Sequence, residues 1–200
     1  MQAKFITFEG GEGSGKTTQS KHLFECFKSQ NINVIWTREI GGTIVAEKIR
    51  DIILHNNMDP MTELLLIMAA RKEHFDKVIA PALQAGITVI CDRFIDSTLS
   101  YQGGNLGVTK VLEFHQNVFH DFMPDLTFFI DVLPEEGLKR AVMRGGNNKF
   151  EDKNILEHEN IRQNFINLLN IFPKRIFKID GMRREDEISN EILSIATGIL

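Results

Sequence analysis

Residues 10–17 read GGEGSGKT, which fits the pattern G-x-x-x-x-G-K-[ST] without a mismatch. The apolar run Phe5–Phe8 before this segment predicts a strand, and residues 16–29 after it have the pattern of a helix. Glycines let the backbone curl so that successive N–H groups face one phosphate, and the helix adds its positive N-terminal end. The segment therefore constrains the chain to a strand–loop–helix unit that binds a nucleotide phosphate.

The side chains of this phosphate-binding loop (P-loop) have predictable roles. Lys16 is placed to bridge the β- and γ-phosphates, and the Thr17 hydroxyl to ligate Mg²⁺. We therefore expect ATP and Mg²⁺ as cofactors. The motif alone leaves open whether the chain is a kinase, an ATPase or a switch. The predicted ATP-binding residues are Gly10, Gly11, Glu12, Gly13, Ser14, Gly15, Lys16, Thr17 and Thr18.

Short β-like runs alternate with longer helical patterns along the rest of the chain. Strands are predicted at 5–8, 33–37, 87–91, 126–132 and 175–179, and helices at 16–29, 43–54, 59–83, 134–144, 154–171 and the C-terminal end. This alternation predicts an α/β fold of the three-layer P-loop NTPase type, with a five-stranded parallel sheet and helices on both faces. We expect one domain over residues 1–200, with a short lid at about 144–153, where the sequence is polar and glycine-rich.

Composition narrows the classes of partner. Lys and Arg total 23 against 27 Asp and Glu, a net charge of −4 that argues against nucleic-acid binding. No apolar stretch reaches the roughly 20 residues that a membrane span needs, and the N-terminus lacks the apolar segment of a signal peptide. Cys26 and Cys91 show no metal or redox spacing, so a reducing cytoplasm is the expected location. The six histidines form no metal-ligand motif.

Four arginines occur near predicted strand ends, whereas an N-K-x-D-like segment typical of GTPases is absent from the sequence. Asp92 and Arg93 directly follow the third predicted strand. An Asp at that point is placed to hold the metal or its water, and the Arg to grip a phosphate with two parallel hydrogen bonds. Transfer of a phosphoryl group between two nucleotides depends on such positive charge. The arginines, which favour a kinase, are Arg38, Arg50, Arg71 and Arg93.

The chain resembles bacterial thymidylate kinases over nearly its full length. The resemblance rests on FEGGEGSGKTT at 8–18, TREIGGT at 37–43, AARKEH at 69–74, DRFIDSTLSYQGG at 92–104, PDLTFFIDV at 124–132 and the region after Arg140. The third and fourth stretches, at this spacing, are the most specific. The resemblance implies transfer of the γ-phosphate of ATP to dTMP, giving dTDP for dTTP supply and DNA synthesis. It also implies a homodimer, for which the apolar patterns at 60–83 and 109–120 are suitable.

Roles on the phosphate and sugar side follow from the resemblance. Arg38 and Arg93 match arginines around the acceptor phosphate, and Arg50 matches a group near the base or phosphate. Glu12 matches an acid that contacts the sugar 3′-hydroxyl. Tyr101 matches a ring under the sugar C2′ that would clash with a ribose hydroxyl.

Roles on the base side follow in the same way. Arg71 matches a donor to thymine O4, Gln102 a side chain facing the base, and Thr98 a small hydroxylic residue near the base. Cytosine carries an amino group in place of O4 and would leave such a donor unpaired. Glu39 completes the predicted substrate-binding set together with Ile67.

The resemblance also implies a cation from the lid, because the P-loop here contains no arginine. Lys149 falls where the resemblance expects an arginine, and we favour it, with Arg144 as the alternative. Lysine is a point charge and cannot fork across two oxygens. The predicted catalytic residues are thus Lys16, Arg93, Lys149 and Arg144, and the predicted metal-binding residues are Thr17 and Asp92.

Two positions depart from the family pattern. Ile40 stands where the family has proline, and Ile67 where it commonly has a phenylalanine that stacks on thymine. An aliphatic side chain gives up ring–ring geometry worth about 0.5–1.5 kcal/mol in aromatic pairs. We therefore expect weaker dTMP binding than in relatives, unless Phe94 or another ring compensates. Two other functions stay open at this point. One is a kinase for dUMP, dCMP or UMP, and the other is a P-loop regulatory protein with weak or no turnover.

Overall fold

A computed structural model describes residues 3–145 and 149–199. Five strands form one parallel sheet in the order β2-β3-β1-β4-β5. The sheet confirms the predicted α/β fold, and each predicted strand is found with its ends shifted by no more than one residue. The strands are β1 (Phe5–Glu9), β2 (Val34–Arg38), β3 (Thr88–Asp92), β4 (Leu126–Asp131) and β5 (Ile176–Asp180).

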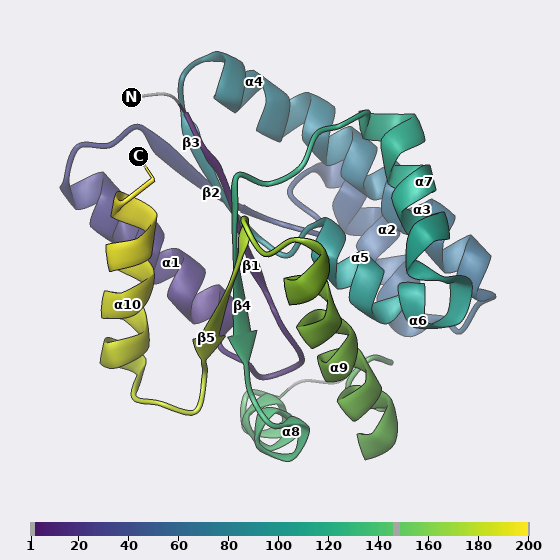
Figure 1. The fold of residues 1–200 in the computed structure, drawn as a ribbon. Coiled ribbons are helices and arrows are strands. Elements are labelled where there is room, and N and C mark those ends of the chain that lie inside the picture. Colours follow the sequence, from purple (N-terminus) through teal and green to yellow (C-terminus); the bar gives the residue numbers. More distant parts are fainter. Residues whose placement is uncertain (1–2, 146–148, 200) are drawn as a thin grey trace.

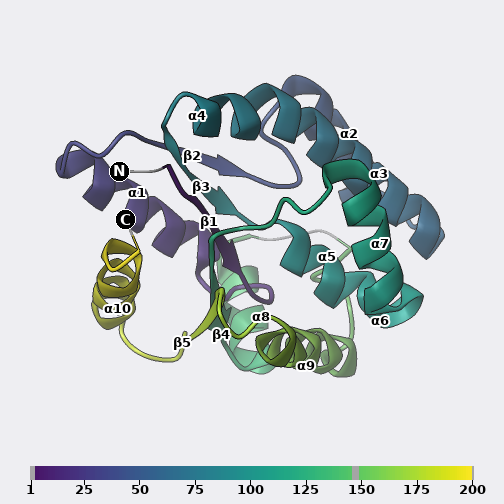
Figure 2. The same ribbon diagram turned by 45° about the horizontal axis from the view of Figure 1, so that its top comes forward.

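Helices cover both faces of the sheet (Figure 1). Every residue of β1, β3 and β4 is buried, as expected for strands covered on both sides. One face carries α1 (Lys16–Ser29) and α10 (Glu185–Thr197) over a core that includes Phe8, Phe27 and Phe128. The helices α3, α4, α5, α7 and α9 lie on the opposite side (Figure 2). The bounds are α2 (Ile44–His55), α3 (Pro60–His74), α4 (Ala80–Gln84), α5 (Ile95–Tyr101), α6 (Gly103–Leu106), α7 (Val108–Phe119), α8 (Pro134–Met143) and α9 (Ile155–Ile171).

The helix predicted from residue 59 to 83 is continuous but not uniform. Asp59 caps its first turn by accepting from the Met61 amide at 2.8 Å, and Pro60 occupies the first helical position. A π-helical segment, Phe75–Ile79, then separates α3 from α4. The α3 portion carries two of the side chains predicted to bind substrate, Ile67 and Arg71.

Helices α5, α6 and α7 were not predicted. Helices α5 and α6 are short, with 7 and 4 residues, and Gly103, Gly104 and Gly107 interrupt the pattern around them. Helix α7 has 12 residues and an amphipathic pattern, which entered the prediction only as an apolar surface at 109–120. The packing of these helices against α3 and α9 supplies the burial that stabilises them. The first of them, α5, follows directly on Arg93 and turns the segment after β3 into part of the site wall.

Strand register brings the sequence motifs to one edge of the sheet. Phe8 of β1 and Arg38 of β2 both pair with Asp92 of β3, so the segments that follow these strands begin side by side. Arg93 turns the chain with a φ of 70°, a region that non-glycine residues seldom occupy. Ligands of open parallel sheets bind at this carboxyl edge. No helix within 3–145 or 149–199 has the length and apolarity to cross a membrane.

Candidate active site

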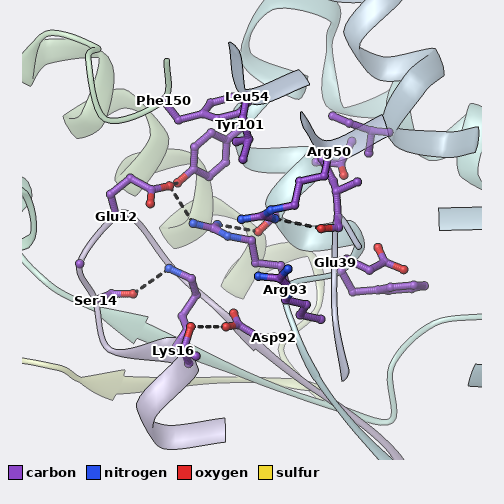
Figure 3. Close-up of a pocket in the computed structure, with 18 of the residues that line it drawn as sticks. Glu12, Ser14, Lys16, Glu39, Arg50, Leu54, Asp92, Arg93, Tyr101 and Phe150 are labelled. Atoms are coloured by element: carbon purple, nitrogen blue, oxygen red, sulfur yellow. Dashed lines mark hydrogen bonds and ion pairs between the residues drawn. The ribbon is translucent and has the colours of Figure 1, made fainter. Parts of the chain in front are cut away.

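A cavity of about 760 Å³ opens at the carboxyl edge of the sheet (Figure 3). It gathers side chains from the P-loop, β2, α2, α3, the β3–α5 segment and the region after α8. The predicted substrate-binding residues all line it: Glu12, Arg38, Glu39, Arg50, Ile67, Arg71, Arg93, Thr98, Tyr101 and Gln102. Of the predicted ATP-binding loop, Glu12 to Thr18 line it, whereas Gly10 and Gly11 are not among its lining residues.

Lys16 stands at the start of α1 and reaches back over the P-loop. Its Nζ donates to the Gly11 carbonyl at 2.6 Å and to Ser14 Oγ at 3.1 Å. Burial, together with the charge of Arg93, lowers the pKa of Lys16 to about 8 although Glu12 and Asp92 oppose this. A buried, cationic amine at the helix N-terminus is suited to hold a polyphosphate.

The P-loop touches α8 through two glycines. A Cβ on Gly13, whose φ is 65°, would lie 1.8 Å from the Gly137 carbonyl oxygen. A Cβ on Gly137 would in turn lie 2.3 Å from the Glu12 carbonyl oxygen. Only glycine therefore allows the backbone of α8 to approach the loop this closely. The contact fixes the helix that leads into the predicted lid.

The two predicted metal-binding residues meet. Thr17 Oγ1 donates to Asp92 Oδ2, while Asp92 Oδ1 is buried without a hydrogen-bond partner in the described part of the chain. An orphaned carboxylate oxygen is costly unless an ion or a water completes it. Hydroxyl and carboxylate oxygens are the ligands that Mg²⁺ prefers, so this pair fits the ion. No group of three or more His, Cys, Asp or Glu that could hold a metal occurs within 3–145 and 149–199.

Glu12 is the meeting point of three elements. Its Oε1 accepts from Arg93 Nη2 at 2.7 Å and from the Tyr101 hydroxyl at 2.9 Å (Figure 3). Burial works to raise the pKa of Glu12, but Arg93 and Lys16 outweigh it and lower the pKa to about 2. The carboxylate is therefore ionised at neutral pH. Glu12 lines the cavity, and its second oxygen makes no hydrogen bond within the described residues.

Three arginines make this part of the cavity positive. Arg93 also donates to Ser97 Oγ at 3.0 Å, Arg50 to the Ile40 carbonyl at 2.9 Å, and Arg38 to Glu47 at 2.8 Å. Burial and the charges of Arg38 and Arg93 lower the pKa of Arg50, which shows how closely the three charges are held. An anion placed between them would relieve this repulsion.

The far end of the cavity is built around buried Arg71. Its Nε donates to Glu39 Oε2 at 2.6 Å and its Nη2 to Thr98 Oγ1 at 2.9 Å. His74 holds the other Glu39 oxygen at 3.1 Å, and the guanidinium lies 4.8 Å from the centre of the Phe94 ring. Burial raises and Arg71 lowers the pKa of Glu39, with a lowered pKa as the net result. Nη1 contacts only Met68 Sδ at 4.0 Å among the described residues, so its hydrogens are left for a ligand.

Ile67 and Gln102 complete this end. Ile67 is only 4% exposed and lies one helical turn before Arg71, so both side chains face the cavity from α3. Gln102 is 5% exposed, and its Nε2 donates to Glu63 Oε1 at 2.7 Å. The predicted base-recognising residues are thus together on one wall.

The two predicted lid cations are placed differently. Arg144 lines the cavity and acts through its charge on Glu12. Lys149 is not among the lining residues; its ammonium pairs with Glu63 and donates to the Asn56 carbonyl at 3.0 Å. The choice between Lys149 and Arg144 as the phosphate-contacting cation stays a prediction. Residues 146–148 of the predicted lid lie outside the described residues.

The predicted site residues leave out several residues that line the cavity: Lys21, Trp36, Ile40, Leu54, Phe94, Ser97, Phe150 and Glu151. Phe150 has the clearest sequence signal, because it is a single aromatic residue in the polar segment GGNNKFEDK. Its ring lies edge-on to Tyr101, with centroids 5.6 Å apart. Phe94 and Ser97 lie in DRFIDS, within one of the stretches that carry the family resemblance, so their position indicated that they are near the site. Trp36 and Leu54 lie outside all of these stretches.

Comparison with known proteins identifies the family. A thymidylate kinase family model matches residues 8–192. The chain belongs to the thymidylate kinase family.

Relatives and a solved structure agree with this assignment. A thymidylate kinase from Rickettsia africae is 54% identical over 177 residues, covering 88% of this chain and 87% of the relative. One from Orientia tsutsugamushi is 49% identical over 199 residues, covering 96% and 92%. The crystal structure of thymidylate kinase from Ehrlichia chaffeensis superposes with a TM-score of 0.79 at 34% identity, covering 98% of this chain and 99% of the other.

Proposed function

We propose that the cavity is the active site of a thymidylate kinase that holds two nucleotides end to end. The observation that carries this proposal is the joining of a P-loop with a buried, base-reading arginine in one cavity. The reaction moves the γ-phosphate of ATP to dTMP and yields dTDP and ADP. The family assignment favours this reaction over another pyrimidine acceptor and over a regulatory role.

ATP binds at the P-loop end in this proposal. Successive N–H groups of residues 10–18 face its β- and γ-phosphates, and Lys16 exchanges its loop partners for phosphate oxygens. Thr17 and Asp92 would hold Mg²⁺, which neutralises phosphate charge when bound. Both side chains meet at the phosphate end, which supports this assignment.

dTMP binds between the arginine cluster and Arg71. Arg93, Arg38 and Arg50 hold its phosphate, and the free side of the Glu12 carboxylate accepts from the 3′-hydroxyl. Arg71 Nη1 donates to thymine O4, while Thr98 and Glu39 hold the guanidinium in place. Ile67 packs on the base face, Gln102 meets the base edge, and Tyr101 packs under the sugar C2′.

Catalysis then consists mainly of positioning. A dTMP phosphate oxygen attacks the γ-phosphorus, the new P–O bond forms, and the bond to the β–γ bridging oxygen breaks as ADP leaves. Lys16, Arg93 and the lid cation Arg144 balance the negative charge spread over the transferred group. Arg144 is favoured over Lys149 because it is the one that lines the cavity.

Several wider features belong to the same proposal. One domain spans the chain, and the segment at about 144–153 acts as its lid. The enzyme is cytoplasmic, consistent with its unpaired Cys26 and Cys91. It assembles as a homodimer, for which Leu65 on α3 and Ile52 on α2, 51% and 47% exposed, supply apolar surface. Size-exclusion chromatography with light scattering should give a molar mass of twice that of the chain. The Leu65→Glu variant should give the mass of a single chain.

The direct test is ADP release from ATP, measured with and without dTMP and with Mg²⁺ present or chelated. We expect turnover that requires dTMP and Mg²⁺ together. Asp92→Asn should raise the Mg²⁺ concentration needed for half-maximal rate, because one ligand charge is lost. ATP binding without any dTMP-dependent turnover would instead place the protein in the regulatory class.

A further inference from the structure

A chain of three polar side chains runs from the cavity to the predicted lid. Gln102 Nε2 donates to Glu63 Oε1 at 2.7 Å, and the ammonium of Lys149 pairs with Glu63 Oε2. Glu63 is in the first turn of α3 and is not among the cavity-lining residues. It therefore acts on a ligand only through its partners.

The chemistry of Glu63 fixes which way the Gln102 amide points. An ionised carboxylate only accepts hydrogen bonds, so the group that Gln102 turns toward it must be the NH₂. Oε1 and Nε2 lie on opposite sides of the amide carbon, so the oxygen is the atom left for the cavity. The side chain is 5% exposed, and turning the amide over would set two oxygens against each other in a buried place.

The direction of this amide decides which base it fits. Thymine and uracil carry a hydrogen on N3 and need an acceptor opposite it, whereas cytosine N3 is itself an acceptor. An amide oxygen facing N3 pairs with the first two bases and repels the third. We propose that Glu63 is a specificity-determining positioning residue, which holds Gln102 so that its oxygen selects bases with an N3–H.

This inference rests on the proposed function, because it assumes that Gln102 faces the acceptor base. The helix geometry supports it independently of the family. Glu63, Ile67 and Arg71 follow one another at intervals of four residues, so a single stripe of α3 faces the base wall. Arg71 would recognise the base at O4 and Gln102 would recognise it at N3, so two separate contacts would discriminate against cytosine.

Lys149 strengthens the orientation and extends it to the lid. Its ammonium pairs with Glu63 Oε2, the oxygen that Gln102 does not use, and its backbone N–H donates to the Leu54 carbonyl at 3.2 Å. The segment that follows residue 148 is thereby attached beside the base wall. Lys149 thus has a role in acceptor selection that a phosphate-contacting cation would not have.

The experiment is to measure kcat/KM for dTMP, dUMP and dCMP in the wild-type enzyme and in Glu63→Gln. In the variant, Lys149 donates to the new amide oxygen, so the new NH₂ turns toward Gln102. Gln102 must then present its oxygen to position 63 and its NH₂ to the base. We expect the dTMP-to-dCMP ratio to fall at least about tenfold, the effect of one reversed hydrogen bond.

Two comparisons separate this role from a structural one. The dTMP-to-dUMP ratio should stay within about twofold, because both bases carry the same N3–H and differ only in the methyl group. Glu73→Gln, the same change on the same helix at a residue that does not line the cavity, should leave all ratios unchanged. Melting temperatures close to that of the wild type should accompany these ratios in both variants, because neither change alters the fold.

The outcomes are distinct. A fall of the dTMP-to-dCMP ratio alone supports the proposal. An equal loss with all three acceptors, or an unchanged ratio in a folded variant, overturns it. N3-methyl-dTMP gives a second readout: it should be rejected less strongly by Glu63→Gln than by the wild type, and equal rejection would also overturn the proposal. Wild-type protein without dTMP turnover would contradict the proposed function itself.

Discussion

Nη2 of Arg93 lies 2.7 Å from Oε1 of Glu12, which joins the end of β3 to the P-loop in one ion pair. The Tyr101 hydroxyl meets the same oxygen from α5. One carboxylate thus fixes the arginine proposed for the acceptor phosphate and the ring proposed for the sugar. The P-loop thereby positions both nucleotides, and not ATP alone.

Arg93→Lys should lower kcat by about 10²–10³-fold, the cost of removing one preorganised donor to developing charge. Lysine keeps the charge but cannot serve Glu12, Ser97 and a phosphate at once. Steady-state kinetics with dTMP measures the loss. Arg183→Lys, at an exposed ion pair with Glu191, is the matched control and should keep full activity. Normal kcat in Arg93→Lys would remove Arg93 from the transfer step.

Variants of the two proposed lid cations, Arg144 and Lys149, should change different kinetic constants. Arg144→Ala should lower kcat about 10-fold or more with little change in the KM for dTMP, because its charge acts on the transferred group. Lys149→Ala should act chiefly on the KM for dTMP, because its partner Glu63 orients Gln102. If Lys149→Ala instead loses more kcat than Arg144→Ala, the lysine is the phosphate contact after all.

ATP binding should weaken as pH rises above about 8. Burial lowers the pKa of Lys16 to about 8 in the free protein, and a bound triphosphate favours the charged amine, so binding takes up a proton above that pH. The Kd for ATP should rise by at most about tenfold per pH unit between pH 8 and the pKa that Lys16 has when ATP is bound. Calorimetry in buffers of different ionisation heat counts the protons, and no uptake at pH 9 would contradict the prediction.

Glu9 is the control for this pH effect. Burial, together with the charge of Asp96, raises the pKa of the Glu9 carboxyl to about 8, so it gains negative charge over the same window. Glu9→Gln removes that titration and leaves Lys16 in place. The pH dependence of ATP binding should therefore persist in the variant, with at most a smaller slope.

Gly137→Ala should separate α8 from the P-loop. Its added Cβ would lie 2.3 Å from the Glu12 carbonyl oxygen, which forces backbone to move. We expect a lower melting temperature and a rise of at least about tenfold in the KM for ATP, because a loop shift of an ångström is costly in a positioned site. Gly198→Ala is the control, since its Cβ would meet Ile195 O at an ordinary 3.4 Å. Equal behaviour of the two variants would contradict the importance of the contact.

Most of the fold, and the end of the site proposed for ATP, could be predicted from local sequence patterns. The P-loop could be predicted because its residues are contiguous, and the five strands because buried parallel strands are short apolar runs bounded by turns. Helices α5 and α6 escaped prediction because they are short and adjoin or contain glycines, so that their packing stabilises them more than their local sequence does. Helix α7, with 12 residues, carried an amphipathic pattern that the prediction did not assign to a helix.

Partners far apart in sequence could not be predicted. Glu39 was expected to bind substrate, but only the structure pairs it with Arg71, 32 residues away, and with His74. The contact of Glu63 with Lys149 spans 86 residues, and charge alone cannot say whether a lid lysine faces a phosphate or a carboxylate. That ambiguity leaves the choice of lid cation a prediction, in which Lys149 was preferred from the sequence and Arg144 is the one that lines the cavity.

The measurement that tests the account most directly is kcat/KM for ADP release with dTMP, dUMP, dCMP, UMP and AMP in turn. We predict that dTMP leads and dUMP follows, since both present O4 and N3–H. We expect a lower kcat/KM for dCMP because cytosine does not fit Arg71 and Gln102, and for UMP because its ribose hydroxyl would clash with Tyr101. The kcat/KM for AMP should be the lowest. Leading turnover with dCMP, UMP or AMP would contradict the assignment of the base and sugar walls.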